Sequence, residues 1–446
     1  MASLTPLFIA LQLIKLVYAS SNYFMLPLHQ ISGAYFAKLD IGTPPTEFRV
    51  AVDTGSSDLW IHSQNDPACS LNIAGFSNCT FGVFNSSNSS TYTNLNQSFT
   101  ALYQDTTFAN GVYSTDDIGA NGLPLGTFQF ALVNDSSTPM GILGVSLPQL
   151  EASALNKGRH QYNNFPLQLY ENGIISYPAY SVYLNGNKGS NVLFGGIDHH
   201  KYKGQLVKMP LIKGIQPEIK TLSVELNSLS ITVGDSLSIS PNSSTFLFQG
   251  SIPAIIDTGT TIATLPLSLY KQLALALGLQ YDAVYDGYIG SCSSLEEKNI
   301  HFSFSGVLLS APALNFVANL TENTCIYVAS PSIVPQLVLG QAFLENVYLV
   351  VDLQAKSLAM AQSNLHSDIS DIQVLENGIL SIPIVSDLVS IRNTSSIPTP
   401  QHTSTSTTKP STHLQTLVHK HSVANGAPNI FSIGSHWWLV AYIALY

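Results

Sequence analysis

Charged side chains are scarce in this chain of 446 residues, which restricts the functions that it can have. Asp, Glu, Lys and Arg make up 10% of the sequence, and the formal net charge is −10. Nucleic-acid-binding proteins carry basic patches, so this balance argues against a nucleic-acid partner. The hydrophobic fraction of 45% is large enough for a sizeable core.

Several motifs for other chemistries are also missing. The sequence has no His-Glu-x-x-His zinc helix, no Gly-x-Ser-x-Gly nucleophile motif and no phosphate-binding glycine loop before a helix. His199 and His200 are adjacent, but histidines in a loop after a strand usually face solvent rather than bind metal. We therefore expect neither a metal ion nor an organic cofactor.

Cysteine is rare, with four residues in two local pairs, Cys69 with Cys79 and Cys292 with Cys325. Neither pair has the short spacing of a metal-binding knuckle. An even count in an exported chain favours disulfides over zinc. Each link would close a loop within one half of the chain and stabilise the fold by roughly 2–4 kcal/mol.

Long apolar runs are missing as well. The apolar end, Trp437–Tyr446, is shorter than the roughly 20 residues that a membrane-spanning helix needs. Residues 425–446, with Asn425 at the attachment site, instead resemble a signal for a GPI anchor, although a merely hydrophobic terminus is the alternative. Residues 393–424 are rich in Ser, Thr and Pro and indicate an exposed stalk, preceded by a linker at residues 366–392.

Export is indicated by two features. Residues 1–20 are mostly apolar and end near a small-residue cleavage site, as in a signal peptide, although Lys15 interrupts the run and a buried first helix is the alternative. Eight asparagines begin N-x-Ser/Thr triplets and are candidate glycosylation sites: Asn78, Asn85, Asn88, Asn96, Asn134, Asn242, Asn319 and Asn393. We expect a glycoprotein that is secreted and held at the cell surface, on the plasma membrane or in the cell wall.

Between residues 22 and 362 the pattern is typical of an all-β fold. Short runs of aromatic and branched residues alternate with Gly, Pro, Asn and Ser. The predicted strands include Ala34–Leu39, Phe48–Val52, Phe128–Val133, Val192–Phe194, Ala254–Ile256 and Tyr348–Val351. Helical periodicity is clear only at Leu267–Leu277, where Leu269, Tyr270, Leu273 and Leu277 share one face.

Two similar segments lie about 200 residues apart. Each is an apolar strand that ends in Asp, Thr and Gly and continues with two hydroxyl residues, at residues 50–57 and 254–261. One Asp-Thr-Gly usually marks only a turn, but two copies with matching flanks indicate an internally duplicated fold. Each half would contribute one carboxyl group, from Asp53 and Asp257.

Two carboxyl groups fit one particular chemistry. Peptide hydrolysis without a metal or a covalent nucleophile needs one carboxylate to take a proton from water and a second, protonated group to donate to the carbonyl oxygen. Two carboxyl groups within hydrogen-bond distance cannot both ionise, so the pair shares one proton. Gly55 and Gly259 allow tight turns beside them, and the hydroxyls of Ser56 and Thr260 can donate to the carboxylates.

The chain from Tyr35 to Gln362 resembles the pepsin family of aspartic proteases, and its pattern is similar to that of the yapsin-like fungal enzymes. The resemblance rests on motifs in the family's order: residues 41–45, the two Asp-Thr-Gly segments, residues 57–60 and 89–92, and the apolar-apolar-Gly elements at 142–144 and 338–340. It implies two β-barrel lobes, at residues 21–195 and 196–365, with a central cleft for an extended polypeptide substrate. It further implies an aspartic endopeptidase that acts at acidic pH, as a monomer.

The same resemblance implies roles for single residues. Asp53 and Asp257 would be the catalytic pair, supported by hydrogen bonds from Ser56 and Thr260. Thr54 and Thr258 match the positions that lock the two loops together across the interface. Tyr103 matches the tyrosine of the flap that closes over substrate, with Trp60 as its hydrogen-bonding neighbour, and Gly55 and Gly259 would line the substrate site.

The sequence departs from the family at two places. The flap reads Tyr103-Gln104-Asp105-Thr106, without its usual two glycines, and Gln341 stands where an aspartate is common. Asp105 could favour basic residues at the cleavage site, or could simply be a solvated flap residue. The altered flap leaves a second hypothesis open, a catalytically weak or inactive cell-surface glycoprotein that only binds peptides.

Overall fold

The computed structural model describes residues 22–70, 79–155, 161–234 and 244–379. Strands dominate these ranges, and the helices are few and short, which confirms the predicted all-β fold. Within the described residues, no helix is both long and apolar enough to span a bilayer. The predicted signal peptide, stalk and anchor signal lie outside these ranges, as do Asn78, Asn242, Asn393 and Asn425.

The N-terminal half forms a closed barrel. Six strands follow one another in the order β2-β3-β8-β4-β7-β6, and an additional pairing of β6 with β2 closes the ring. One further strand, β5, extends from β6. These strands are β2 (Ala34–Ile41), β3 (Thr46–Asp53), β4 (Leu59–His62), β5 (Thr93–Leu102), β6 (Phe108–Ala120), β7 (Leu123–Ser136) and β8 (Gly141–Gly144).

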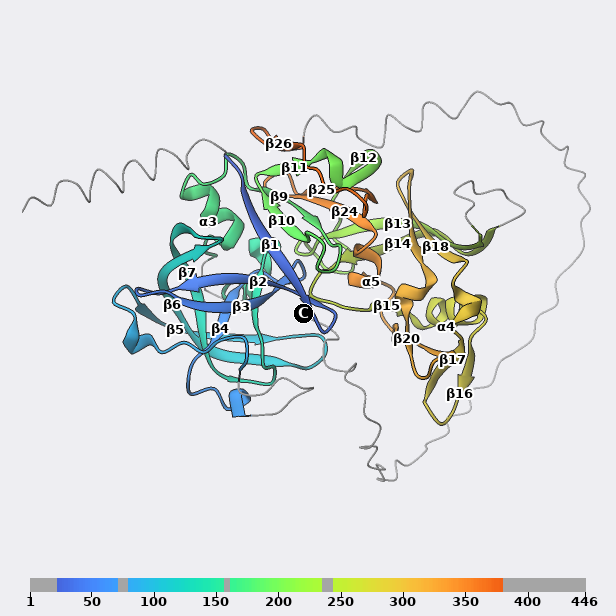
Figure 1. Ribbon diagram of the computed structural model, residues 1–446, viewed down its shortest axis with the longest axis horizontal. Helices are drawn as coiled ribbons and strands as arrows, with labels where there is room; N and C mark the ends of the chain where they lie inside the picture. Colours follow the sequence, from blue (N-terminus) through green and yellow to red (C-terminus); the bar gives the residue numbers. More distant parts are fainter. Residues whose placement is uncertain (1–21, 71–78, 156–160, 235–243, 380–446) are drawn as a thin grey trace, which may run out of the picture.

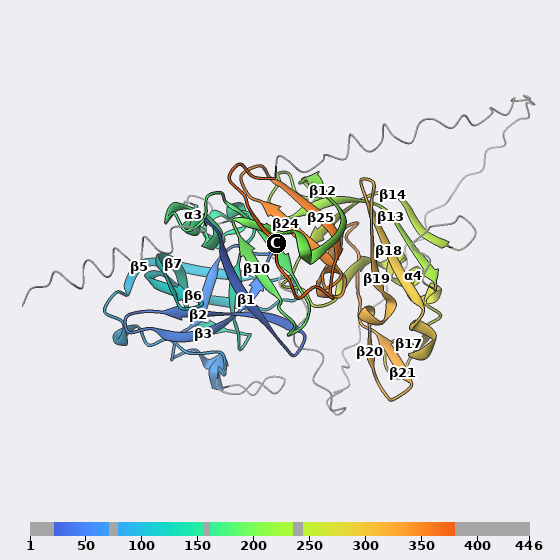
Figure 2. The same ribbon diagram turned by 45° about the horizontal axis from the view of Figure 1, so that its top comes forward.

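A second group of strands joins the two halves. The order β12-β25-β24-β9-β10-β1 continues directly into the barrel, because β1 also pairs with β2. The strands are β1 (Phe24–Ile31), β9 (Ala179–Tyr183), β10 (Asn191–Phe194), β12 (Tyr202–Pro210), β24 (Val347–Asp352) and β25 (Ser357–Ser363). Figures 1 and 2 show this group between the barrel and the C-terminal strands. Strands from both sides of residue 195 therefore share one sheet.

The first strand belongs to both groups. Residues 24–27 of β1 pair with β10, and residues 28–31 pair with β2. Pro27 lies where the pairing changes from one neighbour to the other. A single strand thus fixes the barrel relative to the joining sheet.

The C-terminal half is built from two further sheets. The larger has the order β19-β18-β13-β14-β23-β15-β22, and the smaller has the order β16-β17-β21-β20. Their strands are β13 (Ser223–Val233), β14 (Ser244–Ile256), β15 (Ala263–Pro266), β16 (Gln280–Asp282), β17 (Gly287–Ser291), β18 (Lys298–Phe304), β19 (Val307–Pro312), β20 (Val317–Asn319), β21 (Thr324–Tyr327), β22 (Ser330–Ser332) and β23 (Leu337–Leu339).

The helices are short and lie in connections between strands. They are α2 (Ala152–Leu155), α3 (Phe165–Glu171), α4 (Leu267–Ala276) and α5 (Gln341–Leu344), with 3-10 turns at Pro67–Ser70, Ser86–Asn88, Pro148–Leu150, His199–Lys201, Ser293–Leu295 and Ala313–Phe316. The predicted helix at Leu267–Leu277 is confirmed as α4, and Leu269, Leu273 and Leu277 of its predicted face are buried. Each of the six predicted strands quoted above is also present.

The segment after β25 differs from the prediction. We expected a linker from residue 366, but β26 (Ile372–Val374) pairs with β11 (Gly196–Asp198). Leu375 and Ile379 are buried against Tyr348 and Val350 of the joining sheet. The linker prediction is wrong for residues 366–379, because the local sequence does not reveal a pairing with a strand about 170 residues away.

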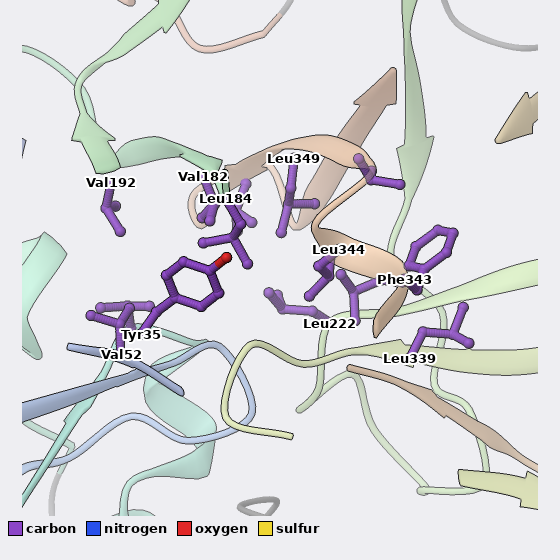
Figure 3. Close-up of a cluster of buried hydrophobic side chains, with 14 of the residues drawn as sticks. Tyr35, Val52, Val182, Leu184, Val192, Leu222, Leu339, Phe343, Leu344 and Leu349 are labelled. Atoms are coloured by element: carbon purple, nitrogen blue, oxygen red, sulfur yellow. The ribbon is translucent and has the colours of Figure 1, made fainter. Parts of the chain in front are cut away.

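One hydrophobic core extends through both halves. Figure 3 shows a part of it, in which Leu222 and Leu344 lie between Tyr35 and Val52 of the N-terminal barrel on one side and Leu339 and Phe343 of the C-terminal half on the other. Val182, Leu349 and their neighbours in the joining sheet complete the cluster. Buried apolar area is the main stabilising contribution to a fold of this size, so the halves form one unit.

Candidate active site

Asp53 and Asp257 occupy equivalent places in the two halves. Asp53 is the last residue of β3, and Asp257 directly follows β14. β3 pairs in parallel with β8, and β14 pairs in parallel with β23, so each aspartate lies beside the predicted apolar-apolar-Gly element of its own half. The backbone amide of Val145 donates to the Asp53 carbonyl (2.9 Å), and that of Asp257 donates to the Leu339 carbonyl (3.1 Å).

The two carboxyl groups receive matched hydrogen bonds. The backbone amides of Gly55 and Gly259 donate to Oδ1 of Asp53 (2.7 Å) and of Asp257 (2.9 Å). The hydroxyl of Thr260 donates to Oδ2 of Asp257 (2.8 Å), and the hydroxyl of Ser56 donates to Oδ2 of Asp53. The predicted donors are therefore all present, and both aspartates are completely buried.

A reciprocal exchange joins the two loops. The Thr54 amide donates to the Thr258 hydroxyl (3.0 Å), and the Thr258 amide donates to the Thr54 hydroxyl (2.9 Å). Each hydroxyl then donates across the interface, from Thr54 to the Ile256 carbonyl (3.0 Å) and from Thr258 to the Val52 carbonyl (2.9 Å). The sequence prediction that these threonines lock the loops agrees with this geometry.

The carboxyl groups of Asp53 and Asp257 interact directly with each other. Burial and the charge of Asp257 raise the pKa of Asp53 well above its usual value, and burial raises the pKa of Asp257. The two side chains are hydrogen-bonded to each other, so one of them carries a proton. Gly55 makes this approach possible, because a Cβ atom there would lie 2.7 Å from Cγ of Asp257.

The hairpin of β5 and β6 carries Tyr103 near the aspartates. The Trp60 indole donates to the Tyr103 hydroxyl (2.7 Å), as predicted. Burial and the nearby charge of Asp53 raise the pKa of Tyr103. Oδ1 of Asp105, which is half-buried, accepts from the amide (2.8 Å) and the hydroxyl (2.6 Å) of Thr107, so this carboxylate stabilises the tip of the hairpin.

The tip of the hairpin contains an unusual backbone conformation. Thr106 has a φ of +71°, in the region that favours glycine and is strained for a branched side chain. The Thr106 amide nevertheless donates to the Tyr103 carbonyl (3.0 Å), and the Tyr103 amide donates to the Thr107 carbonyl (2.8 Å). The turn thus keeps a glycine-like shape although its glycines are missing.

Sequence reasoning missed a second buried acidic pair beside the Asp53 loop. Oδ1 of Asp58 accepts from the hydroxyls of Tyr113 (2.9 Å) and Tyr162 (2.8 Å), and Oδ2 accepts from the Ala152 amide (2.7 Å). Glu151 is completely buried, and burial raises its pKa to about 9. The sequence signals for Asp58 were its place directly before the apolar strand β4 and its position within the motif at residues 57–60.

The cysteines form the two predicted disulfides, Cys69–Cys79 and Cys292–Cys325. In the described part of the chain, one group brings three potential metal ligands within 4.8 Å of one another, namely His62, Cys69 and Cys79. Both sulfurs are used in the disulfide, and Nδ1 of His62 lies 2.8 Å from Oδ2 of Asp66. This group is therefore a hydrogen-bonded His62–Asp66 pair next to a disulfide rather than a metal site.

Comparison with known proteins gives a consistent result. The family model described as eukaryotic aspartyl protease matches residues 34–363. The chain is 32% identical over 433 residues to aspartic proteinase MKC7 of Saccharomyces cerevisiae, which covers 82% of this chain and 72% of that protein. It is 33% identical over 368 residues to aspartic proteinase yapsin-3 of the same yeast, with 78% and 69% covered. It is 32% identical over 336 residues to secreted aspartic protease 8 of Candida albicans, with 74% and 76% covered.

Proposed function

Because this chain belongs to the eukaryotic aspartyl protease family, as a yapsin-like member, we propose that Asp53 and Asp257 are the catalytic pair with which it cleaves polypeptides. The protein is an aspartic-type endopeptidase. The observation that supports the residue assignment is a pair of buried carboxyl groups in mutual contact, each held by an equivalent amide and hydroxyl.

The mechanism follows from the single proton that the pair holds. The ionised carboxylate takes a proton from a water molecule as that water attacks the scissile carbonyl. The protonated partner donates its proton to the carbonyl oxygen, and the tetrahedral intermediate then collapses with protonation of the leaving amine. Because burial raises both pKa values, the singly protonated pair persists over an acidic pH range, and we propose that the enzyme works there.

The residue assignment is tested by replacing each aspartate in turn. Asp53→Asn and Asp257→Asn should each reduce hydrolysis of a denatured protein at about pH 4 by at least about 1,000-fold, because an amide can neither accept nor donate this proton. Asp135→Asn, at an exposed aspartate, serves as the control. A pepstatin-type inhibitor should block the wild-type reaction. Wild-type levels of hydrolysis in either dyad variant would rule out the assignment.

The second hypothesis, an inactive peptide-binding glycoprotein, is motivated by the glycine-free flap. Its distinguishing outcome is a correctly folded wild-type protein that binds peptides but never cleaves a denatured protein at acidic pH. We favour the enzyme, because in both Asp-Thr-Gly loops a backbone amide and a hydroxyl donate to the aspartate in an equivalent way.

We propose that Asp105 contributes a preference for basic residues at the cleavage site. It lies two residues after Tyr103 in the flap turn, and its carboxylate is half-buried. Asp105→Asn keeps an oxygen that can accept from Thr107 but removes the negative charge. The expected result is a loss of preference for Lys or Arg before the scissile bond in a peptide library. An unchanged preference would contradict this role.

We also propose that the enzyme is an exported, glycosylated monomer, held at the cell surface by a GPI anchor at Asn425. One chain supplies both aspartates, and its four cysteines form disulfides, which suits an oxidising compartment. Of the candidate glycosylation sites in the described ranges, Asn88, Asn96, Asn134 and Asn319 are exposed and Asn85 is half-buried. Removal of N-glycans should lower the apparent mass, and a phosphatidylinositol-specific phospholipase should release the protein from cells.

A further inference from the structure

The half-buried side chain of Glu345 connects the two halves of the molecule. Glu345 accepts hydrogen bonds from the Gln30 side-chain amide (2.9 Å) and from the Tyr35 hydroxyl (2.9 Å), which lie more than 300 residues earlier in the sequence. Among the described residues, no Lys, Arg or His forms a salt bridge with Glu345. Burial raises the pKa of Glu345, and a carboxyl group that loses water without gaining a cation costs free energy, so this arrangement is one that stability alone does not explain.

On the N-terminal side, Tyr35 is held in place by burial and by a second hydrogen bond. Tyr35 is buried in β2, and its hydroxyl also accepts from the Gly186 amide (2.9 Å) between β9 and β10. Figure 3 shows the ring packed near Val52, with its hydroxyl directed toward the side where Leu344 and Leu349 lie. The next residue, Phe36, pairs with Ala51 of β3, the strand that ends at Asp53.

On the C-terminal side, Glu345 caps a helix that holds the other catalytic loop. Its amide donates to the Gln341 carbonyl at the start of α5 (2.9 Å). The Gln341 amide donates to the Thr260 carbonyl (2.8 Å), and its side chain donates to the Thr258 carbonyl (2.7 Å). The Ala342 amide adds a bond to the Thr261 carbonyl (3.2 Å). The first residues of helix α5 therefore donate hydrogen bonds to three peptide groups of the loop that presents Asp257.

We infer that Glu345 is a positioning residue, which acts through α5 to hold the Asp257 loop against the half that carries Asp53. The inference rests on the proposed roles of Asp53 and Asp257. The exchange between Thr54 and Thr258 joins the loops directly, whereas Glu345 joins the elements behind them. The two carboxyl groups must stay within hydrogen-bond distance to share a proton, so a small shift of one half affects catalysis more than substrate binding.

A change in the separation of the two carboxyl groups should be visible in the pH profile of activity. The two apparent pKa values of the pair lie far apart because the second ionisation is opposed by the first charge. At an effective dielectric constant of about 20, an increase of about 0.5 Å in a separation of about 3 Å weakens this repulsion by about 0.6 pH unit. Loss of Glu345 should therefore narrow the bell-shaped profile of kcat/KM, which a change in global stability would not do.

The test compares Glu345→Ala, Glu345→Gln and Tyr35→Phe with the wild-type enzyme, at concentrations fixed by titration with a pepstatin-type inhibitor. Glu345→Ala and Tyr35→Phe should lower kcat by about 3- to 10-fold, with KM changed less than about two-fold. Glu345→Gln keeps an oxygen that accepts both hydrogen bonds, so it should restore most of kcat. The exposed Glu322→Ala is the matched control.

The outcomes separate this inference from the assignment of the dyad. If the titrated Glu345→Ala enzyme keeps the wild-type kcat and the same width of pH profile, Glu345 does not position the site, even if its melting temperature falls. If kcat falls equally in the alanine and the glutamine variants, the hydrogen bonds are not responsible and the inference also fails. A wild-type enzyme without activity would instead overturn the roles of Asp53 and Asp257.

Discussion

The buried Glu151 predicts how the stability of the protein depends on pH. Burial raises the pKa of Glu151 from 4.5 to about 9, and the charge of Asp58 acts in the same direction. Between these values the folded protein keeps a proton that the unfolded chain has lost. The stabilisation is complete below the unfolded pKa and is lost progressively as the pH rises toward the folded pKa.

The magnitude follows from the linkage relation. Each pH unit within this window lowers the free energy of unfolding by about 1.4 kcal/mol for one proton. Between about pH 5 and about pH 7, the titration of Glu151 alone should thus lower the free energy of unfolding by about 3 kcal/mol. This is a large share of the stability of an ordinary domain. Glu151→Gln removes the titration, and its amide oxygen can still accept from the Tyr162 amide.

The assay is urea unfolding of the wild-type and Glu151→Gln proteins over this pH range. Oε1 of Glu151 has no hydrogen-bond partner among the described residues, so the new NH₂ group adds a constant cost of about 1–3 kcal/mol at every pH. The variant should therefore be less stable than the wild type in acid. As the pH rises, its free energy of unfolding should increase relative to that of the wild type by about 1.4 kcal/mol per pH unit. Asp53 and Asp257 contribute equally to both curves and cancel in the difference.

The exposed Glu171→Gln is the matched control, and its curve should run parallel to that of the wild type. A Glu151→Gln curve that also runs parallel to the wild type would refute the reasoning, because it would mean that Glu151 is ionised in the folded protein at neutral pH.

Three further changes test other parts of the site. Gly55→Ala should leave a folded protein whose hydrolysis rate falls by at least about 100-fold, because the Cβ atom of the alanine would lie 2.7 Å from Asp257. Circular dichroism checks that the variant is folded, and normal activity would contradict the close approach of Gly55 and Asp257. Thr106→Gly should raise the free energy of unfolding by up to about 1 kcal/mol in urea, by relieving a φ of +71°, whereas Thr100→Gly within strand β5 should lower it. Trp60→Phe removes the donor to the Tyr103 hydroxyl and should cost about 1–3 kcal/mol in stability together with a lower kcat/KM; no change in either quantity would show that this bond does not hold the flap.

Much of the fold and of the site could be predicted because the information is local or repeated. Strands such as Phe48–Val52 can be recognised from their run of apolar residues. The two Asp-Thr-Gly segments support each other's interpretation, because the second repeats the pattern of the first. The groups that donate to the aspartates, namely the hydroxyls of Ser56 and Thr260 and the backbone amides of the two glycines, follow within three residues. Short-range hydrogen bonds of this kind depend little on the rest of the chain.

The features that sequence reasoning missed depend on distant neighbours. In the sequence, Glu151 does not differ from other acidic residues, and its burial near Asp58 and Tyr162 is visible only in the folded protein. The positioning role of Glu345 depends on a hydrogen bond from Tyr35, which is 310 residues away in the sequence. The pairing of β26 with β11 also joins segments that are remote in the sequence, about 170 residues apart. No local pattern encodes such contacts, because burial and proximity are set only when the whole chain has folded.

The joining sheet also bears on how the protein would survive being cut. Three strands from after residue 195 (β12, β25 and β24) lie beside three strands from before it (β9, β10 and β1), and the two sets meet where β9 pairs with β24. A single cleavage of the chain in an exposed connection therefore leaves two fragments that remain associated through their paired strands, like the subunits of a tight dimer. Each fragment alone would present a bare sheet edge, ready to recruit a replacement strand from another molecule.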